Sequence, residues 1–458
     1  MTQGLGLYTH NYASADQDDI STPKAHAGTD AIKLTSKIVF AEAANITPRD
    51  DYHPDTRDNL EADQGNKECS WTAESYLLSS GTQGTAPDIA SILTTAFSAS
   101  TNAASEVTAD ATTTTTLKMD ADNLPTGAIG KIAIESASDS GVVSENRYFR
   151  VASNTGGALV IDPPFANAPK ENDTVSATTQ YNTALQDTSY ISLHSSDNVL
   201  GEMGLGSKLS KLDISVTQGE AGMVTMEGLC RDVVNSVHTT LSAGIDDSTT
   251  TVPVNASGNE VGAILLCGTE QMLVTVVDAT GLSLTVERDY DGAVAAAHLI
   301  SVAIGPYEPD ETTAGSRIMS LCGGVWINDV QYKTESVAIS DDEKAVARFE
   351  FGDGGTGNCQ LAAGIDFPEN RELSFETVIY VKTTNEIADL KAKASAGTAV
   401  KVFVQVGTTD GRGAAFSMPA VKFEPFTVPD NKADKIKVTL TSAAVLGTSG
   451  EDAFVFAF

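Results

Sequence analysis

The stretch KLSKLDISVTQGEAGMVTMEGL (residues 208–229) contains the pattern that decides the fold. Its apolar residues alternate with polar ones, and such alternation places the two sets on opposite faces of a β-strand. The alternating residues are Leu212, Asp213, Ile214, Ser215, Val216 and Thr217. Gly219 supplies a turn, and the return strand repeats the mixture with Thr225 and Glu227. This stretch therefore predicts a β-hairpin with one buried and one polar face.

Similar alternation continues towards the C-terminus. GGVWINDVQYKTESVAI (323–339), KAVARFEFG (344–352) and RELSFETVIYVKTT (371–384) all have strand-like composition. One segment differs, NEIADLKAKASAG (385–397), which has helix-forming residues with Asn385 as its expected N-cap and Gly397 as its end. The predicted fold class is therefore mainly β with one short α-helix.

Two other stretches repeat a common template. TTTTTLKMDADNLPTGAIG (112–130) matches STTTVPVNASGNEVGAI (248–264), and TGGALVID (155–162) matches TGLSLTVE (280–287). Each copy has a Thr-rich strand, a glycine turn, further strands and a Thr-Gly turn, which is typical of a small antiparallel β unit. The sequence therefore predicts two related β modules.

The repeats divide the chain into five segments. We expect the modules at 108–182 and 238–306, because linkers rich in Thr, Ser, Asp or Pro bound both. The remaining segments, 1–107, 183–237 and 307–458, are then expected to form one continuous β domain. The modules would be insertions in its loops, where insertions are best tolerated.

Charge and composition exclude several functions. The chain has 458 residues with 61 acidic and 29 basic side chains, a net charge of −32. This balance argues against binding nucleic acid by neutralising phosphates. The N-terminal residues lack the pattern of a secretory signal, and the apolar run 293–305 is too short to span a bilayer. Its five cysteines are far apart in sequence and are expected to be buried free thiols of a reducing cytoplasm: Cys69, Cys230, Cys267, Cys322 and Cys359.

No pattern in the sequence predicts a catalytic, cofactor or metal site. The six histidines have no metal-binding spacing. Gly352, Gly354 and Gly357 match a dinucleotide fingerprint, but no helix pattern follows them, so we interpret them as a loop between strands. The acidic stretches 16–19 and 49–58 lack the spacing of a calcium loop and are expected to be solvated. We therefore expect a protein that is not an enzyme.

The order of these segments resembles a known family. It runs from WTAESYLLSSGTQGTAPDIASILTTAFSAS (71–100) to the hairpin at 208–229, the helix at 385–397 and VKVFVQVGTTDGRGAAFSMPAVKFEPF (400–426), and ends with an aromatic strand. This succession resembles the tail tube proteins of long-tailed bacteriophages. The second repeat is similar to small β modules of phage tail proteins.

The resemblance implies a β-sandwich core whose copies form hexameric rings that stack into a tube. The implied partners are further copies of the chain, the tape-measure protein inside the tube, the tail terminator, and baseplate or tail-tip proteins. DNA would pass through as cargo that does not adhere. Such a protein is made in the bacterial cytoplasm, becomes part of the virion and does not insert into a membrane. Residues 40–70 match the position of a loop that joins successive rings, and the modules would decorate the outside.

Five polar residues are candidates for the lining of the bore. They are Asp213, Thr217, Glu227, Glu372 and Glu376. We expect an electronegative bore, because like charge prevents DNA from adhering. An ordinary solvated outer face fits the same alternation equally well.

Two other classes of protein fit parts of the pattern. Within the virus class, the nearest are a capsid protein and another tail or baseplate component. A carbohydrate-binding or adhesin-like protein is the other class, and it requires exposed aromatic residues in the repeats. The aromatic residues of the repeats are Tyr148, Phe149, Phe165, Tyr181 and Tyr290.

Overall fold

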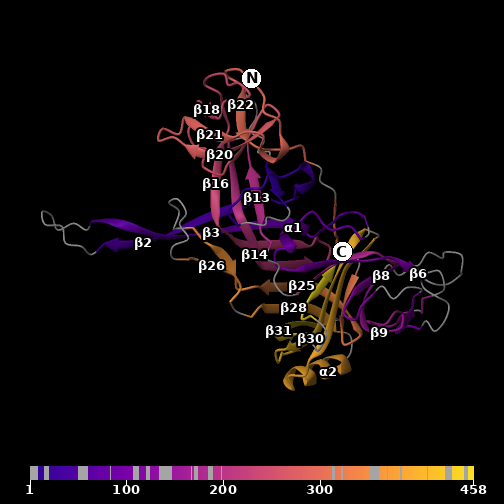
Figure 1. Ribbon diagram of the computed structural model, residues 1–458. Coiled ribbons are helices and arrows are strands. Elements are labelled where there is room, and N and C mark those ends of the chain that lie inside the picture. The colour runs from indigo at the N-terminus through magenta and orange to yellow at the C-terminus, as the bar shows by residue number, and fades with distance from the viewer. Residues whose placement is uncertain are drawn as a thin grey trace.

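The computed structural model is mainly β (Figure 1). It describes residues 9–14, 20–49, 60–82, 84–106, 113–119, 124–133, 147–166, 168–169, 174–183, 189–197, 199–311, 315–320, 323–350, 361–368, 370–381, 384–409, 411–428, 436–447 and 452–458. Half of the described strands belong to one sixteen-stranded sheet, and the two modules form separate six-stranded sheets.

One half of the large sheet is a row of seven antiparallel strands. In order across the sheet they are β2 (Val39–Arg49), β3 (Leu60–Tyr76), β15 (Met223–Cys230), β14 (Leu200–Thr217), β25 (Val330–Asp342), β28 (Glu372–Val381) and β31 (Ile436–Leu446). The hairpin predicted at 208–229 is the β14–β15 pair at the centre of this row.

The other half of the sheet closes a barrel. The second part of β31 pairs with β30 (Arg412–Phe423), which pairs with β29 (Val400–Thr409). β29 pairs with β24 (Gly323–Ile327), and β24 returns to the first residues of β25. Six strands therefore form a closed ring, because β25 and β31 each change partner along their length. β30 also pairs with β32 (Val455–Ala457), and the sheet continues from β32 to β12 (Thr178–Asn182) and then to β5 (Ser98–Asn102).

Shorter strands complete the core. The first part of β14 pairs with β13 (Ile191–Ser196) and β16 (Asp232–Val237), and β13 pairs with β1 (His10–Ala13). Two small pairs lie outside the main sheet. They are β4 (Leu78–Ser79) with β23 (Ser316–Arg317), and β26 (Val346–Arg348) with β27 (Gly364–Asp366).

Helices are few in the described part of the chain. The predicted helix is α2 (Thr384–Ser395), and a second, four-residue helix is α1 (Ala90–Leu93), which the sequence did not predict. Because α2 begins at Thr384, Asn385 lies in its first turn and is not the N-cap. Gly397 ends it as expected, with φ of +61°. The 3₁₀ turns are η1 (Gly28–Asp30) and η2 (Tyr290–Gly292). Neither α-helix is long and apolar enough to cross a membrane.

The two repeats form sheets with the same strand order. Module 1 consists of β6 (Ser105–Glu106), β7 (Thr116–Lys118), β8 (Ile129–Ala133), β9 (Arg147–Thr155), β10 (Ala158–Asp162) and β11 (Thr174–Ser176). Module 2 consists of β17 (Thr239–Thr240), β18 (Thr251–Pro253), β19 (Ile264–Cys267), β20 (Glu270–Val277), β21 (Ser283–Glu287) and β22 (Ala303–Pro306). In each module the first strand pairs with the last, and the second closes the opposite edge.

The glycine turns of the two modules are equivalent in detail. Gly127 and Gly262 have φ of +87° and +93°, a region that glycine adopts without strain. The amide of Gly127 donates to the Val151 carbonyl and that of Gly262 to the Val274 carbonyl, both at 2.8 Å. Both boundaries of module 1 differ from the predicted 108–182, because β6 lies before residue 108 and β12 lies within the range but pairs in the large sheet.

The modules and one long hairpin leave the core in different directions. In Figure 1, module 2 lies at the top and module 1 at the lower right. β2 and β3 extend to the left as an arm, which we call the β2–β3 arm. Residues 40–70, predicted to be a loop, are thus mostly an antiparallel hairpin, and its tip at 50–59 lies outside the described residues.

Candidate functional site

The row of strands β3, β15, β14, β25 and β28 has one polar face. Residues directly opposite each other in antiparallel strands share a face, so the register identifies its members. One line across the sheet contains Thr72, Glu227, Lys211, Asp342 and Glu372. The next contains Glu74, Thr225, Asp213, Ser340 and Ser374. These lines are adjacent because they lie two residues apart on every strand.

All five predicted candidates lie on this face. Glu227 and Glu372 lie in the first line, and Asp213 lies in the second. Glu376 is opposite Ala338 in the third line, and Thr217 is opposite Ser336 in the fourth. The structure therefore brings together residues that are distant in sequence. The widest separation, between Asp213 and Glu376, is 163 positions.

The reverse side of these strands is apolar and buried. Ile214, Ile339 and Phe375 are at most 3% exposed and belong to the main hydrophobic cluster. These residues alternate with the polar ones, so the burial of one face fixes the other towards solvent or a partner.

Carboxylates dominate the polar face, which we call the acidic face. It carries seven acidic side chains: Glu68, Glu74, Asp213, Glu227, Asp342, Glu372 and Glu376. Three lysines also lie on this face: Lys211 and Lys344 pair with some of the carboxylates, and Lys333 is opposite Tyr380, which shares the face of Glu376. The excess of carboxylates leaves the face electronegative.

The ion pairs on the acidic face are local. The Lys211 ammonium lies 2.7 Å from Asp213 and 3.9 Å from Glu227. Lys344 lies 2.6 Å from Asp342 and 2.9 Å from Glu372. Hydrogen bonds to these carboxylates raise the pKa of both lysines. Both lysines therefore stay charged at neutral pH and anchor carboxylates in place.

Three acidic residues of this face were not among the candidates. Glu68 and Glu74 lie on β3, and Asp342 ends β25. The signal for the first two was present in ECSWTAESY (68–76), where exposed residues alternate with buried Cys69, Trp71 and Ala73. The expectation of a loop at 40–70 concealed Glu68 only, because Glu74 lies beyond that range.

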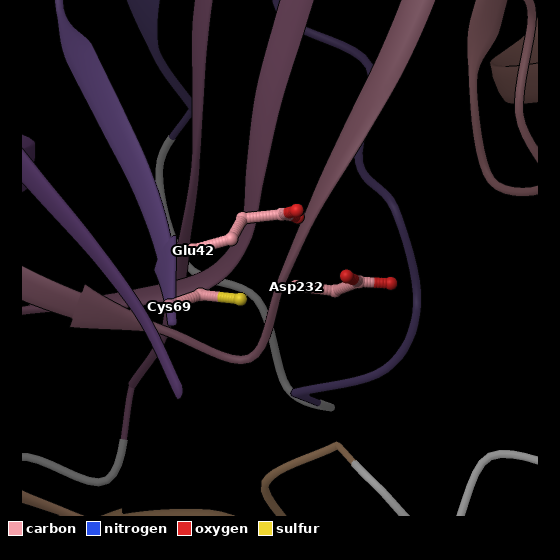
Figure 2. A group of neighbouring side chains, drawn as sticks. All are labelled: Glu42, Cys69 and Asp232. Atoms are coloured by element: carbon pink, nitrogen blue, oxygen red, sulfur yellow. The ribbon is translucent and has the colours of Figure 1, made fainter. Parts of the chain in front are cut away.

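A second cluster of candidate functional side chains, formed by Glu42, Cys69 and Asp232, lies at the base of the β2–β3 arm. Figure 2 shows Glu42 and Asp232 pointing into the same space as the thiol of Cys69. One donor atom from each lies within 4.8 Å of the other two. The Lys67 ammonium contacts both carboxylates, at 2.5 Å from Glu42 and 2.9 Å from Asp232. No sequence pattern predicted a cluster of possible metal ligands here.

Cys69 also has a thiol neighbour. Cys230 lies directly opposite it on β15, and both side chains are 1% exposed. A hydrogen bond between the two thiols, together with burial, raises the pKa of Cys230 well above its ordinary value. The expectation of buried free thiols is confirmed for Cys69, Cys230 and Cys267, and strand pairing brings the first two together although they are distant in sequence.

The aromatic residues of the repeats do not form a sugar-binding surface. Tyr148, Phe149, Phe165 and Tyr181 are all at most 5% exposed. The fifth, Tyr290, donates a hydrogen bond to the Pro23 carbonyl. These side chains serve packing, so they offer no platform for stacking against a sugar ring.

Some predicted features lie outside the described residues. They are the glycine motif at 352–357, the acidic stretch 16–19 and nearly all of the stretch 49–58. No protein-family model matches the chain, and no curated protein matches it.

Proposed function

We propose that the chain is a tail tube subunit of a long-tailed bacteriophage, a structural protein without enzymatic activity. In this proposal six copies form a ring, rings stack into a tube, and the acidic face lines the bore. The barrel and its extended sheet are the counterpart of the β-sandwich tube core. The tube would enclose the tape-measure protein and later conduct DNA.

The acidic face is the observation that carries this proposal. Seven carboxylates and three lysines lie on one ordered sheet surface backed by a buried core. Such a surface repels phosphate at short range. A conduit requires this property, since DNA that adhered to the wall would stop moving.

The β2–β3 arm and the open edge strands support assembly. An edge strand presents unpaired backbone groups that pair readily with another chain. Pairing between copies closes such edges in a ring with rotational symmetry. In the proposed tube the arm, which extends beyond the body, contacts the neighbouring ring (Figure 1).

Electron microscopy of the concentrated, purified chain tests the assembly. We expect six-fold rings or hollow tubes with outward knobs formed by the modules. Particles that remain monomeric at every concentration, and in the presence of the tail-tip proteins of the same phage, would contradict the proposal.

Charge reversal tests the bore. Glu372→Lys with Glu376→Lys should leave assembly intact but cause the tubes to retain short duplex DNA at low salt. Glu287→Lys with Asp310→Lys is the matched control, because both residues are exposed and lie outside the acidic face. Retention of DNA by the control, or none by the double variant, would place the acidic face on the outside.

A further inference from the structure

The group at the base of the arm joins three chain segments. Glu42 lies on β2, Cys69 on β3, and Asp232 is the first residue of β16. Cys69 is directly opposite Glu42 on one side and Cys230 on the other, so all three side chains share a face. The convergence is therefore a product of strand register and not of a flexible loop.

The geometry suits a small tetrahedral cation. In a zinc site, metal–ligand distances of about 2.0–2.3 Å place the donor atoms roughly 3.3–3.8 Å apart. Here the oxygen and sulfur atoms lie within 4.8 Å of one another. A contraction on the order of 1 Å, within the reach of carboxylate rotamers, would bring the three donor atoms to coordination distance.

Lys67 already marks this point as a cation position. Its ammonium bridges the two carboxylates, 2.5 Å from Glu42 and 2.9 Å from Asp232. The side chain is 26% exposed, so it can move into solvent when another cation enters. Glu42, with 40% exposure, leaves an entry path.

We infer that Glu42, Cys69 and Asp232 bind a thiophilic divalent cation such as Zn²⁺, with the fourth position left to solvent. A sulfur donor selects against the hard cations Mg²⁺ and Ca²⁺. On binding, the Cys69 thiol loses its proton to solvent, because a coordinated thiol is deprotonated. The ion would replace Lys67 and fasten both strands of the arm to the β15–β16 corner.

Metal titration of the full-length chain tests this inference. The protein is stripped with a chelator, kept reduced with a phosphine, and titrated with Zn²⁺ against a chromophoric competitor. We expect one ion per chain. With Cd²⁺ as the probe, a thiolate-to-metal charge-transfer band should appear in the ultraviolet.

Variants separate this site from adventitious binding. Cys69→Ser should remove the band and weaken Zn²⁺ binding by about 100-fold, whereas Cys267→Ser, a buried thiol of module 2, should change neither. Glu42→Gln should weaken binding by about tenfold and keeps the test valid if Cys69→Ser does not fold.

The Lys67→Gln variant best distinguishes a metal-binding site from a purely structural ion pair. If Lys67 competes with the metal, its removal tightens Zn²⁺ binding by about two- to tenfold. A purely structural ion pair predicts no tighter binding. Unchanged affinity in Lys67→Gln, or affinity in Glu42→Gln within about twofold of the parent, would overturn the inference.

Discussion

Modules 1 and 2 share one strand order but are attached to the core in different ways. Module 1 contributes Ile129 and Tyr148 to an apolar cluster with the barrel residues Trp326, Phe403 and Ala415. Each module also has its own apolar cluster: that of module 1 contains only module residues, whereas that of module 2 includes Met203 and Val234 from the core strands. Module 1 therefore meets the barrel through a separate apolar cluster, and module 2 meets the core by sharing its own.

Polar contacts follow the same division. At module 1, the Tyr148 hydroxyl donates to the Gly413 carbonyl at 3.1 Å, and the Arg147 guanidinium lies 4.6 Å from the centre of the Trp326 ring. At module 2, exposed hydrogen bonds contribute to the contact, as between the His238 ring and the Asp197 carbonyl at 3.1 Å. Sequence duplication therefore does not preserve the interface.

Excision of module 1 should have the largest effect. Thr178 is directly opposite Asn102, so a tight turn can replace residues 103–177. We expect the product to aggregate, because the Trp326 and Phe403 side chains lose their cover. Soluble yield and cooperative thermal unfolding measure the outcome.

The control is excision of 238–306, which uncovers mainly Met203 and Val234. This product should stay soluble, unfold cooperatively and still assemble. Equal tolerance of both excisions would remove the contrast between the modules.

Trp326→Ala should have the next largest effect. Trp326 is 7% exposed and lies between module 1 and Phe403, so truncation removes contacts on both sides. We expect a loss of about 3–5 kcal/mol in the free energy of unfolding. Denaturant titration measures this loss, and a value below about 1 kcal/mol would mean that module 1 is not packed as described.

Acidic pH should loosen module 2 selectively. Burial lowers the pKa of His194 to about 4 and that of His26 well below its ordinary value, and the His26 ring packs 5.1 Å from Tyr307, just after module 2. Because the folded-state pKa values lie below the unfolded values near 6.5, stability is present above pH 6.5 and is lost as pH falls towards 4. After allowance for partial exposure of the histidine rings, we expect the free energy of unfolding to be about 1–2 kcal/mol lower at pH 5 than at neutral pH.

Limited proteolysis between pH 7 and pH 5 measures this effect. Cleavage near 307 should increase, and His194→Gln should flatten the dependence. His238 acts in the opposite direction, since its bond with Glu308 raises its pKa and adds stability at low pH. If cleavage of module 1 increases equally, the effect is global.

Tyr290→Phe should have the smallest effect. It removes only the hydrogen bond from the Tyr290 hydroxyl to the Pro23 carbonyl, while the ring remains. We expect a loss of about 1 kcal/mol or less in the free energy of unfolding. Hydrogen exchange of module 2 amides would detect the change, and a global loss of stability would show that module 2 is more tightly coupled to the core.

The local parts of the fold were predictable from sequence. The match of residues 112–130 with 248–264 predicted two modules, and their sheets have the same strand order. The alternation around Asp213 predicted a polar face, because a period of two residues is a property of the strand itself.

The remaining features depend on partners that are distant in sequence. Barrel closure arises where β25 and β31 change neighbours, and nothing within either strand encodes that change. Cys69 and Cys230 meet only because β3 pairs with β15. The arm was missed because VFAEAANITPR (39–49) lacks a regular apolar alternation.

The length of β3 has a mechanical consequence. One continuous strand, Leu60–Tyr76, runs from the arm into the acidic face, where it pairs with β15. A pull along the arm therefore loads the β3–β15 ladder in shear, so that many perpendicular hydrogen bonds resist together and do not open one at a time. The arm can thus transmit tension to the centre of the sheet without unzipping its edge.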